Sequence, residues 1–242
     1  KNRIWQKITE YAEASASELS ELRRDFHRHP EPGWMEFRTS GRIADLLHLY
    51  GCDEVLTDQQ VCKAEARMGV PEGGGMTGVI GMLHCGMGPT VALRFDIDAL
   101  PVRECEELDH FPVQEGFRSE HAGYMHACGH DGHITVGLGT AKLLCQMREQ
   151  LHGTVKFIFQ PAEEGVRGAR AIVENGHLED VDFLLAAHMY GGSEQHPCGI
   201  CITAGHGLAT TKLDVDFHGK ASHAAAAPEQ GNNALLAAAT AV

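Results

Sequence analysis

The segment from His126 to His133 concentrates side chains that bind metal ions. It contains three histidines, a cysteine and an aspartate in the order His-Ala-Cys-Gly-His-Asp-Gly-His. Imidazole and thiolate are the ligands that zinc and its neighbours prefer, and Gly129 would allow Cys128 and His130 to turn toward the same point. The segment therefore predicts a metal site. The alternative interpretation is a helix start that is rich in histidine by chance.

Two adjacent glutamates, Glu163 and Glu164, follow an apolar stretch that ends at Phe159. Adjacent side chains beyond a strand end point in different directions, so one carboxylate could hold a metal ion while the other accepts a proton. The residues alone do not say which glutamate has which role. A solvated acidic loop is the alternative.

Metal-compatible side chains follow two further apolar stretches. Asp96 and Asp98 come directly after one of them, and His188 ends the other. In an open α/β sheet, ligands bind at the carboxyl ends of the strands. We therefore expect these side chains to lie with Glu163 and Glu164 at one edge of a sheet, although His188 alone could be an ordinary strand-end histidine.

The elements that must position these residues follow from the spacing of apolar side chains. Apolar residues recur at steps of three or four from Ile4 to Phe26, until Pro30 stops the pattern, which predicts a long helix. A second predicted helix runs from Phe37 to Tyr50, with Gly51 placed as a left-handed C-cap. Further helices are predicted around 134–150 and 167–174, and strands at 79–83, 91–95, 155–159 and 183–187. This alternation predicts an α/β fold with a central, mostly parallel sheet flanked by helices.

A second domain is predicted to begin at residue 209. Leu213, Val215 and Phe217 alternate with polar residues, as in a half-exposed strand. The chain then turns through residues 219–223 and enters an alanine-rich helix after Asn232 or Asn233. The expected domains are therefore residues 1–208 and 209–242.

Composition and charge exclude several functional classes. The 242 residues are 43% hydrophobic and include 33 acidic against 20 basic residues, a formal net charge of −13. A surface with this charge is a poor match for nucleic acid or an anionic membrane. The chain has no apolar run long enough to cross a bilayer and no apolar secretory signal at its start, so a cytoplasmic location is expected.

Other catalytic motifs are weak or absent. Cys198 and Cys201 have the spacing of a redox dithiol, but no helical pattern follows them. The sequence contains no His-Glu-x-x-His, no P-loop and no Gly-x-Ser-x-Gly. A zincin, a P-loop nucleotidase and a serine hydrolase are therefore disfavoured.

Four segments together resemble the di-metal amidohydrolases of the aminoacylase and carboxypeptidase type, a family that includes hippurate hydrolase and the plant auxin-conjugate hydrolases. The segments are RRDFHRHPE at 23–31, RFDIDALP at 94–101, MHACGHDGH at 125–133 and FQPAEEG at 159–165. The resemblance implies a zinc-exopeptidase-like catalytic domain, incomplete in residues 1–208. It also implies that residues 209–242 are the truncated start of an inserted α+β lid and dimerisation domain.

The same resemblance implies roles for individual residues. It makes Cys128, His130, Glu164 and His188 ligands of two divalent metal ions, Mn²⁺ or Zn²⁺, with a further histidine ligand downstream of this chain. Glu163 becomes the general acid and base, and His223 the residue that reaches a partner subunit's active site. Asp96 and Asp131 are then candidates to orient the ligands.

The implied reaction is metal-dependent hydrolysis of the amide bond of an N-acyl amino acid. Within the family, residues 209–214 and 231–236 resemble the A-type subunits of aminobenzoyl-glutamate hydrolases, which suggests p-aminobenzoyl-glutamate as the substrate. Hydrolysis of another N-acyl amino acid, such as hippurate, is an alternative, as is a catalytically silent metal-binding subunit. The expected assembly is a homodimer or a heteromer with a related B-type subunit.

Overall fold

The computed structural model describes residues 2–165, 167–189, 199–200 and 215–241. The chain divides into two compact units, Lys1–Gly199 and Ile200–Val242. The predicted domain boundary at 208/209 lies outside the described residues, as do Cys198 and Cys201. None of the described helices combines the length and apolar character that crossing a membrane requires.

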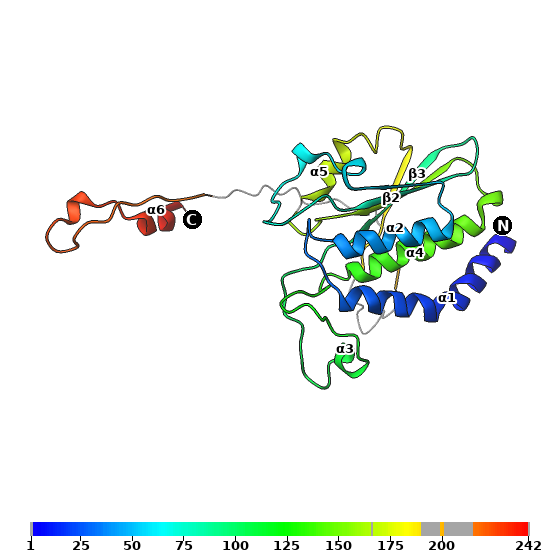
Figure 1. Cartoon of the computed structure of the whole chain (residues 1–242), viewed down its shortest axis with the longest axis horizontal. Helices are drawn as coiled ribbons and strands as arrows, with labels where there is room; N and C mark the ends of the chain where they lie inside the picture. The colour runs from blue at the N-terminus through cyan, green and yellow to red at the C-terminus, as the bar shows by residue number, and fades with distance from the viewer. Residues whose placement is uncertain (1, 166, 190–198, 201–214, 242) are drawn as a thin grey trace. The chain divides into compact units, whose positions relative to one another are not determined.

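A five-stranded sheet forms the centre of the first unit (Figure 1). In spatial order its strands are β1 (Glu54–Thr57), β2 (Val79–His84), β4 (Thr154–Gln160), β3 (Thr90–Asp96) and β5 (Phe183–Ala186). β3 pairs parallel with β4 and β5, whereas β2 pairs antiparallel with β1 and β4. Four strands therefore run in one direction and β2 runs against them. The predicted α/β class and four predicted strands are confirmed, and the short β1 was not predicted.

Helices cover both faces of this sheet (Figure 1). One face is covered by α1 (Asn2–Arg28), α2 (Phe37–Tyr50) and α4 (His130–Gln146), and the other by α5 (Gly168–Val173), while the short α3 (Phe111–Gln114) lies in a loop. Successive side chains of β4 point to opposite faces of the sheet. Phe157 and Phe159 join the core under α2 and α4, whereas Ile158 joins the core on the α5 side. This alternation gives the sheet two separate apolar cores.

The start of α4 differs from the prediction and determines where His130 lies. The helix begins at His130 instead of near Ile134, directly after Gly129, whose φ of 82° is left-handed. His130, Asp131 and His133 are polar and residue 132 is glycine, so apolar periodicity could not reveal this first turn. The helix ends at Gln146, and residues 148–150 form a 3₁₀ turn. At α2, the predicted left-handed C-cap at Gly51 is confirmed with a φ of 91°.

The second unit is described from residue 215 to 241. Its helix α6 (Ala234–Ala241) starts where predicted, because the Asn233 side-chain oxygen accepts the backbone N–H groups of Leu235 and Leu236. Of the strand predicted around 213–217, Leu213 lies outside the described residues. Val215 and Phe217 are not in a described strand.

Candidate metal centre

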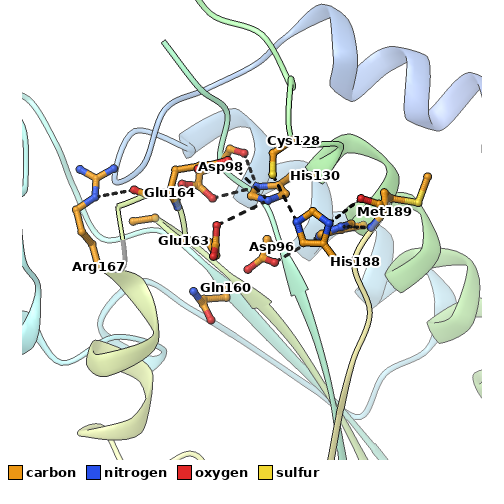
Figure 2. Close-up of polar contacts among 12 residues, drawn as sticks. Asp96, Asp98, Cys128, His130, Gln160, Glu163, Glu164, Arg167, His188 and Met189 are labelled. Atoms are coloured by element: carbon orange, nitrogen blue, oxygen red, sulfur yellow. Dashed lines mark hydrogen bonds and ion pairs between the residues drawn. The ribbon is translucent and has the colours of Figure 1, made fainter. Parts of the chain in front are cut away.

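The predicted metal-compatible side chains meet at one edge of the sheet (Figure 2). Asp96 ends β3, Glu163 and Glu164 follow β4, and His188 follows β5. Because β3, β4 and β5 are parallel, their carboxyl ends lie at the same edge. The turn into α4 brings Cys128 and His130 to this edge as well. The predicted convergence of three strand ends is therefore present in the structure.

A first group consists of Cys128, His130 and His188, whose candidate ligand atoms all lie within 4.8 Å of one another. The Cys128 Sγ is 3.4 Å from the His188 Nε2. His188 Nδ1 donates to the backbone oxygen of Met189 at 2.7 Å, so the Nε2 lone pair is directed toward the thiol. The group thus presents one sulfur and two imidazoles to a common point.

A second group shares His130 and adds both glutamates. The His130 Nε2 lies 3.9 Å from the Glu163 Oε2 and 4.0 Å from the Glu164 Oε1. Its Nδ1 donates to the backbone oxygen of Asp98 at 2.8 Å, which leaves the Nε2 as the acceptor nitrogen. His130 therefore lies between the cysteine and the two carboxylates.

Two buried atoms in these groups fit a metal ion. Among the described residues, the His130 Nε2 and the Glu164 Oε1 have no hydrogen-bond partner. A buried polar atom left in this way costs about 1–3 kcal/mol, which coordination of a cation would offset. Thiolate, imidazole and carboxylate are together the donors that Zn²⁺ and Mn²⁺ accept. The residues present therefore fit divalent cations.

Asp98 connects the two groups, a role that the sequence did not reveal. Its backbone oxygen accepts the His130 Nδ1–H, and its carboxylate Oδ2 accepts the backbone N–H of Glu164 at 2.9 Å. Asp98 is fully buried two positions after the end of β3. The signal that could have indicated this role is its position after the same strand as Asp96.

The two aspartates expected to orient the ligands differ in their contacts. The Asp96 Oδ2 lies 3.4 Å from the His133 Nδ1, and these two residues form a third group of candidate ligands with His130. Asp131 is directed elsewhere, because its carboxylate accepts Arg23 Nε at 3.0 Å and contacts His27 Nδ1 at 2.9 Å. It therefore supports α4 from the side of α1.

Burial changes the acidity of several groups at this edge. Burial, together with nearby Asp96, raises the pKa of Glu163. Burial and the neighbouring Glu164 raise the pKa of the Cys128 thiol to about 11, so a bound cation would be needed to keep the thiolate at neutral pH. His126 lies outside the three candidate ligand groups of the described residues. Burial lowers the pKa of its imidazole to about 4, which leaves it neutral.

His223, the last of the predicted site residues, belongs to the second unit. Its Nδ1 accepts the backbone N–H groups of Ala225 and Ala226 at 3.2 and 3.1 Å. These contacts fix the orientation of its imidazole within its own turn. The expected contact of His223 with an active site stays a prediction.

The strand ends supply carboxylates and one imidazole, and the turn into α4 adds a thiol and a second imidazole. This fold and donor set are those of the metal-binding α/β class of proteins. Residues 92–242 match Peptidase family M20/M25/M40. The chain belongs to this family. The family resemblance seen in the sequence is thereby confirmed.

Three relatives illustrate the match. The chain is 42% identical to the A-type subunit of p-aminobenzoyl-glutamate hydrolase from Escherichia coli (strain K12), over 98% of this chain and 59% of that protein. It is 43% identical to indole-3-acetyl-aspartic acid hydrolase of Enterobacter agglomerans, over 97% of this chain and 59% of that protein. A crystal structure of a dinuclear metal-binding M20 peptidase from Bacillus subtilis matches with a TM-score of 0.60 and 40% identity, covering 73% of this chain and 43% of that one. The chain therefore spans about 59% of the length of these two sequence relatives.

Proposed function

We propose that this protein hydrolyses the amide bond of an N-acyl amino acid with two divalent metal ions. The observation that carries the proposal is the convergence of Cys128, His130, His188 and the two glutamates at one sheet edge. Membership of the M20 family and the dinuclear metal-binding relative support two ions in place of one.

Among these residues, we assign Cys128, His130, Glu164 and His188 as metal ligands and Glu163 as the general base. The buried, unpartnered Oε1 favours Glu164 as the ligand. The Glu164 side chain is 22% exposed and that of Glu163 is 35% exposed, so Glu163 is the more accessible to water and substrate. Thiolate coordination favours zinc, whereas the carboxylate suits manganese equally well.

The chemistry divides between the cations and the side chains. Two divalent ions would polarise the scissile carbonyl and lower the pKa of the attacking water. Glu163 takes the proton from that water and returns it to the nitrogen of the leaving amine, a role that typically contributes on the order of 10²- to 10⁴-fold. Burial shifts the pKa of Glu163 upward, toward neutral pH, which suits a group that must both accept and donate a proton. His223 of a neighbouring subunit would stabilise the oxyanion.

The names of two relatives guide the choice of substrate. One acts on p-aminobenzoyl-glutamate and the other on indole-3-acetyl-aspartic acid. Both names join an aromatic acyl group to an acidic amino acid. We propose p-aminobenzoyl-glutamate as the substrate, with other N-acyl amino acids, including hippurate, as alternatives.

A second candidate function is a catalytically silent subunit that holds metal ions and completes a partner. Two relatives carry the name of an A-type subunit or of its homologue, which favours a heteromer with a related B-type subunit over a simple homodimer. In this case the ligands would be kept while turnover would require the partner.

An assay of the full-length protein purified alone separates these candidates. The protein would be loaded with Mn²⁺ or Zn²⁺, its metal content measured by mass spectrometry, and its activity measured on p-aminobenzoyl-glutamate, indole-3-acetyl-aspartate and hippurate. Two ions per chain with hydrolysis support the enzyme. Two ions without hydrolysis, followed by activity once a B-type subunit is added, support the silent subunit. Failure to bind any ion contradicts both.

A further inference from the structure

A glutamate far from the metal-binding motifs lies beneath the loop that carries Glu163 and Glu164. Glu36, just before α2, is fully buried. Its Oε1 accepts the backbone N–H of Ala162 at 2.8 Å, and its Oε2 accepts the Thr77 hydroxyl at 2.6 Å. Its backbone oxygen accepts the N–H of Ser40 in the first turn of α2. Glu36 therefore joins the start of α2 to the segment that leaves β4.

Ala162, the residue that Glu36 holds, has a strained backbone. Its φ is +48°, in the left-handed region, which costs an L-residue roughly 1–2 kcal/mol. Its carbonyl accepts the backbone N–H groups of Arg167 and Gly168 at 3.2 and 2.9 Å, at the start of α5. Such a conformation persists only where the surroundings fix it. Both polar backbone groups of Ala162 are therefore hydrogen-bonded, and Glu36 supplies the acceptor for the N–H.

The direction of the next two residues depends on this turn. Beyond Ala162, the Glu164 N–H donates to Asp98 and the Glu164 carbonyl accepts Arg167 Nε at 3.0 Å. These contacts fix the backbone that follows Glu163, and the contact between Glu36 and Ala162 fixes the backbone that precedes it. The close approach of Gly33 leaves the loop little room to relax, because an added Cβ there would lie 2.9 Å from the Ala162 Cα. The hydrogen bond between the Ala162 N–H and Glu36 is therefore the contact that holds the backbone on the β4 side of Glu163.

We propose that Glu36 is a positioning residue, which by accepting the Ala162 N–H holds the turn after β4 so that Glu163 and Glu164 face the metal centre. The hydrogen bond between Ala162 and Glu36 is independent of the proposed function. Its effect on metal binding rests on the assignment of Glu164 as a ligand.

The side-chain chemistry at position 36 provides matched variants. Burial raises the pKa of Glu36 to about 8, so the carboxyl is largely neutral at pH 7. Glutamine is then a close substitute, because its carbonyl oxygen can accept the Ala162 N–H in the same place. Methionine fills a similar volume without an acceptor. Thr77→Val removes the other hydrogen bond of Glu36 and leaves the contact with Ala162, so it controls for general loss of stability.

Hydrogen exchange of the metal-free full-length protein tests the hydrogen bond between Ala162 and Glu36 directly. In peptides covering 160–168, Glu36→Met should speed exchange of the Ala162 amide by at least ~10-fold, because the N–H loses its acceptor. Glu36→Gln and Thr77→Val should exchange there as wild type does. The proposal is overturned if Glu36→Met exchanges at the wild-type rate, or if Thr77→Val speeds exchange as much. Should Glu36→Met not fold, Glu36→Gln decides alone. Exchange of the Ala162 amide at the wild-type rate supports the proposal, and faster exchange overturns it.

Cobalt binding tests the consequence for the metal centre. Glu36→Met should weaken Co²⁺ binding about 10- to 100-fold, the range typical of groups that orient metal ligands, and Glu36→Gln should restore it. Glu164→Ala is measured in parallel. If Glu164→Ala binds Co²⁺ as wild type does, the ligand assignment fails while exchange still decides the role of Glu36. If Glu164→Ala loses Co²⁺ and Glu36→Met does not, the effect on metal binding is overturned.

Discussion

The Cys128 Sγ and the His188 Nε2 lie 3.4 Å apart although 60 positions separate them in the chain. Cys128 reaches this point from the turn before α4, and His188 from the end of β5. His130 shares the site from the first turn of α4. The proposed metal site therefore depends on two separate parts of the fold.

Replacement of Cys128 should remove metal ions from the protein. Cys128→Ala deletes the sulfur donor and should weaken binding of Zn²⁺ or Co²⁺ by ~100-fold or more, because loss of a ligand exceeds the effect of an orienting contact. Equilibrium dialysis with mass spectrometry measures the loss, and the thiolate absorption of Co²⁺ should disappear. Cys145→Ala is the control, since Cys145 is half-buried beside Cys52 and away from the site. Equal affinities for both variants would contradict the assignment of Cys128.

The two adjacent glutamates should separate metal binding from turnover. Glu163→Gln should keep both ions and lose about 10²- to 10⁴-fold in kcat, because the amide cannot take the proton from water. Glu164→Ala should lose metal affinity first and activity as a result. Metal content and kcat measured on the same preparations compare the two variants. Full activity in Glu163→Gln would remove Glu163 from the mechanism.

The contribution of His27 to stability should fall as the pH rises. Burial by itself would lower the pKa of His27, but contacts with Asp131 at 2.9 Å and Glu104 at 3.0 Å raise it above 6.5. A raised pKa in the folded state means that the contribution is complete below pH 6.5 and is lost as the pH passes the folded-state value. A difference of one between the folded and unfolded pKa values corresponds to about 1.4 kcal/mol of stability.

Urea unfolding between pH 5.5 and 8.5 measures this effect. The difference in the free energy of unfolding between wild type and His27→Gln should be largest at the acid end and shrink toward pH 8.5. A difference that grows with pH would show that the His27 contacts act in the opposite sense.

Two helical glycines should respond in opposite directions to alanine. At Gly137 in α4, an added Cβ would lie 2.7 Å from a ring carbon of Phe159 and 2.8 Å from one of Phe95. We expect Gly137→Ala to destabilise the fold by about 1–3 kcal/mol, as overpacking does. Gly41 in α2 has no atom within 4 Å of an added Cβ. Gly41→Ala should stabilise by up to about 1 kcal/mol because of its higher helix propensity. Thermal unfolding measures both, and a stabilising Gly137→Ala would show that α4 packs less closely on the sheet.

Residue order alone was enough to locate the main elements and the edge at which they meet. Periodic apolar spacing located α1 and α2, because it reports which face of a helix is buried, and short apolar runs located four strands. It also placed Asp96, Glu163 and His188 at one edge, since the carboxyl ends of parallel strands must coincide there. The family resemblance went further and implied different roles for Glu163 and Glu164, which stay a prediction.

Packing in three dimensions established which buried polar groups support that edge. Glu36 contacts Ala162 across 126 positions, and the Asp98 carboxylate contacts Glu164 across 66. Side-chain contacts to single backbone N–H groups leave no periodic trace in a sequence, because they depend on how distant segments pack. The start of α4 at His130 was not predicted for a related reason: the side chains of His130, Asp131 and His133 are polar and face the candidate metal centre and α1, so apolar spacing gives no signal there.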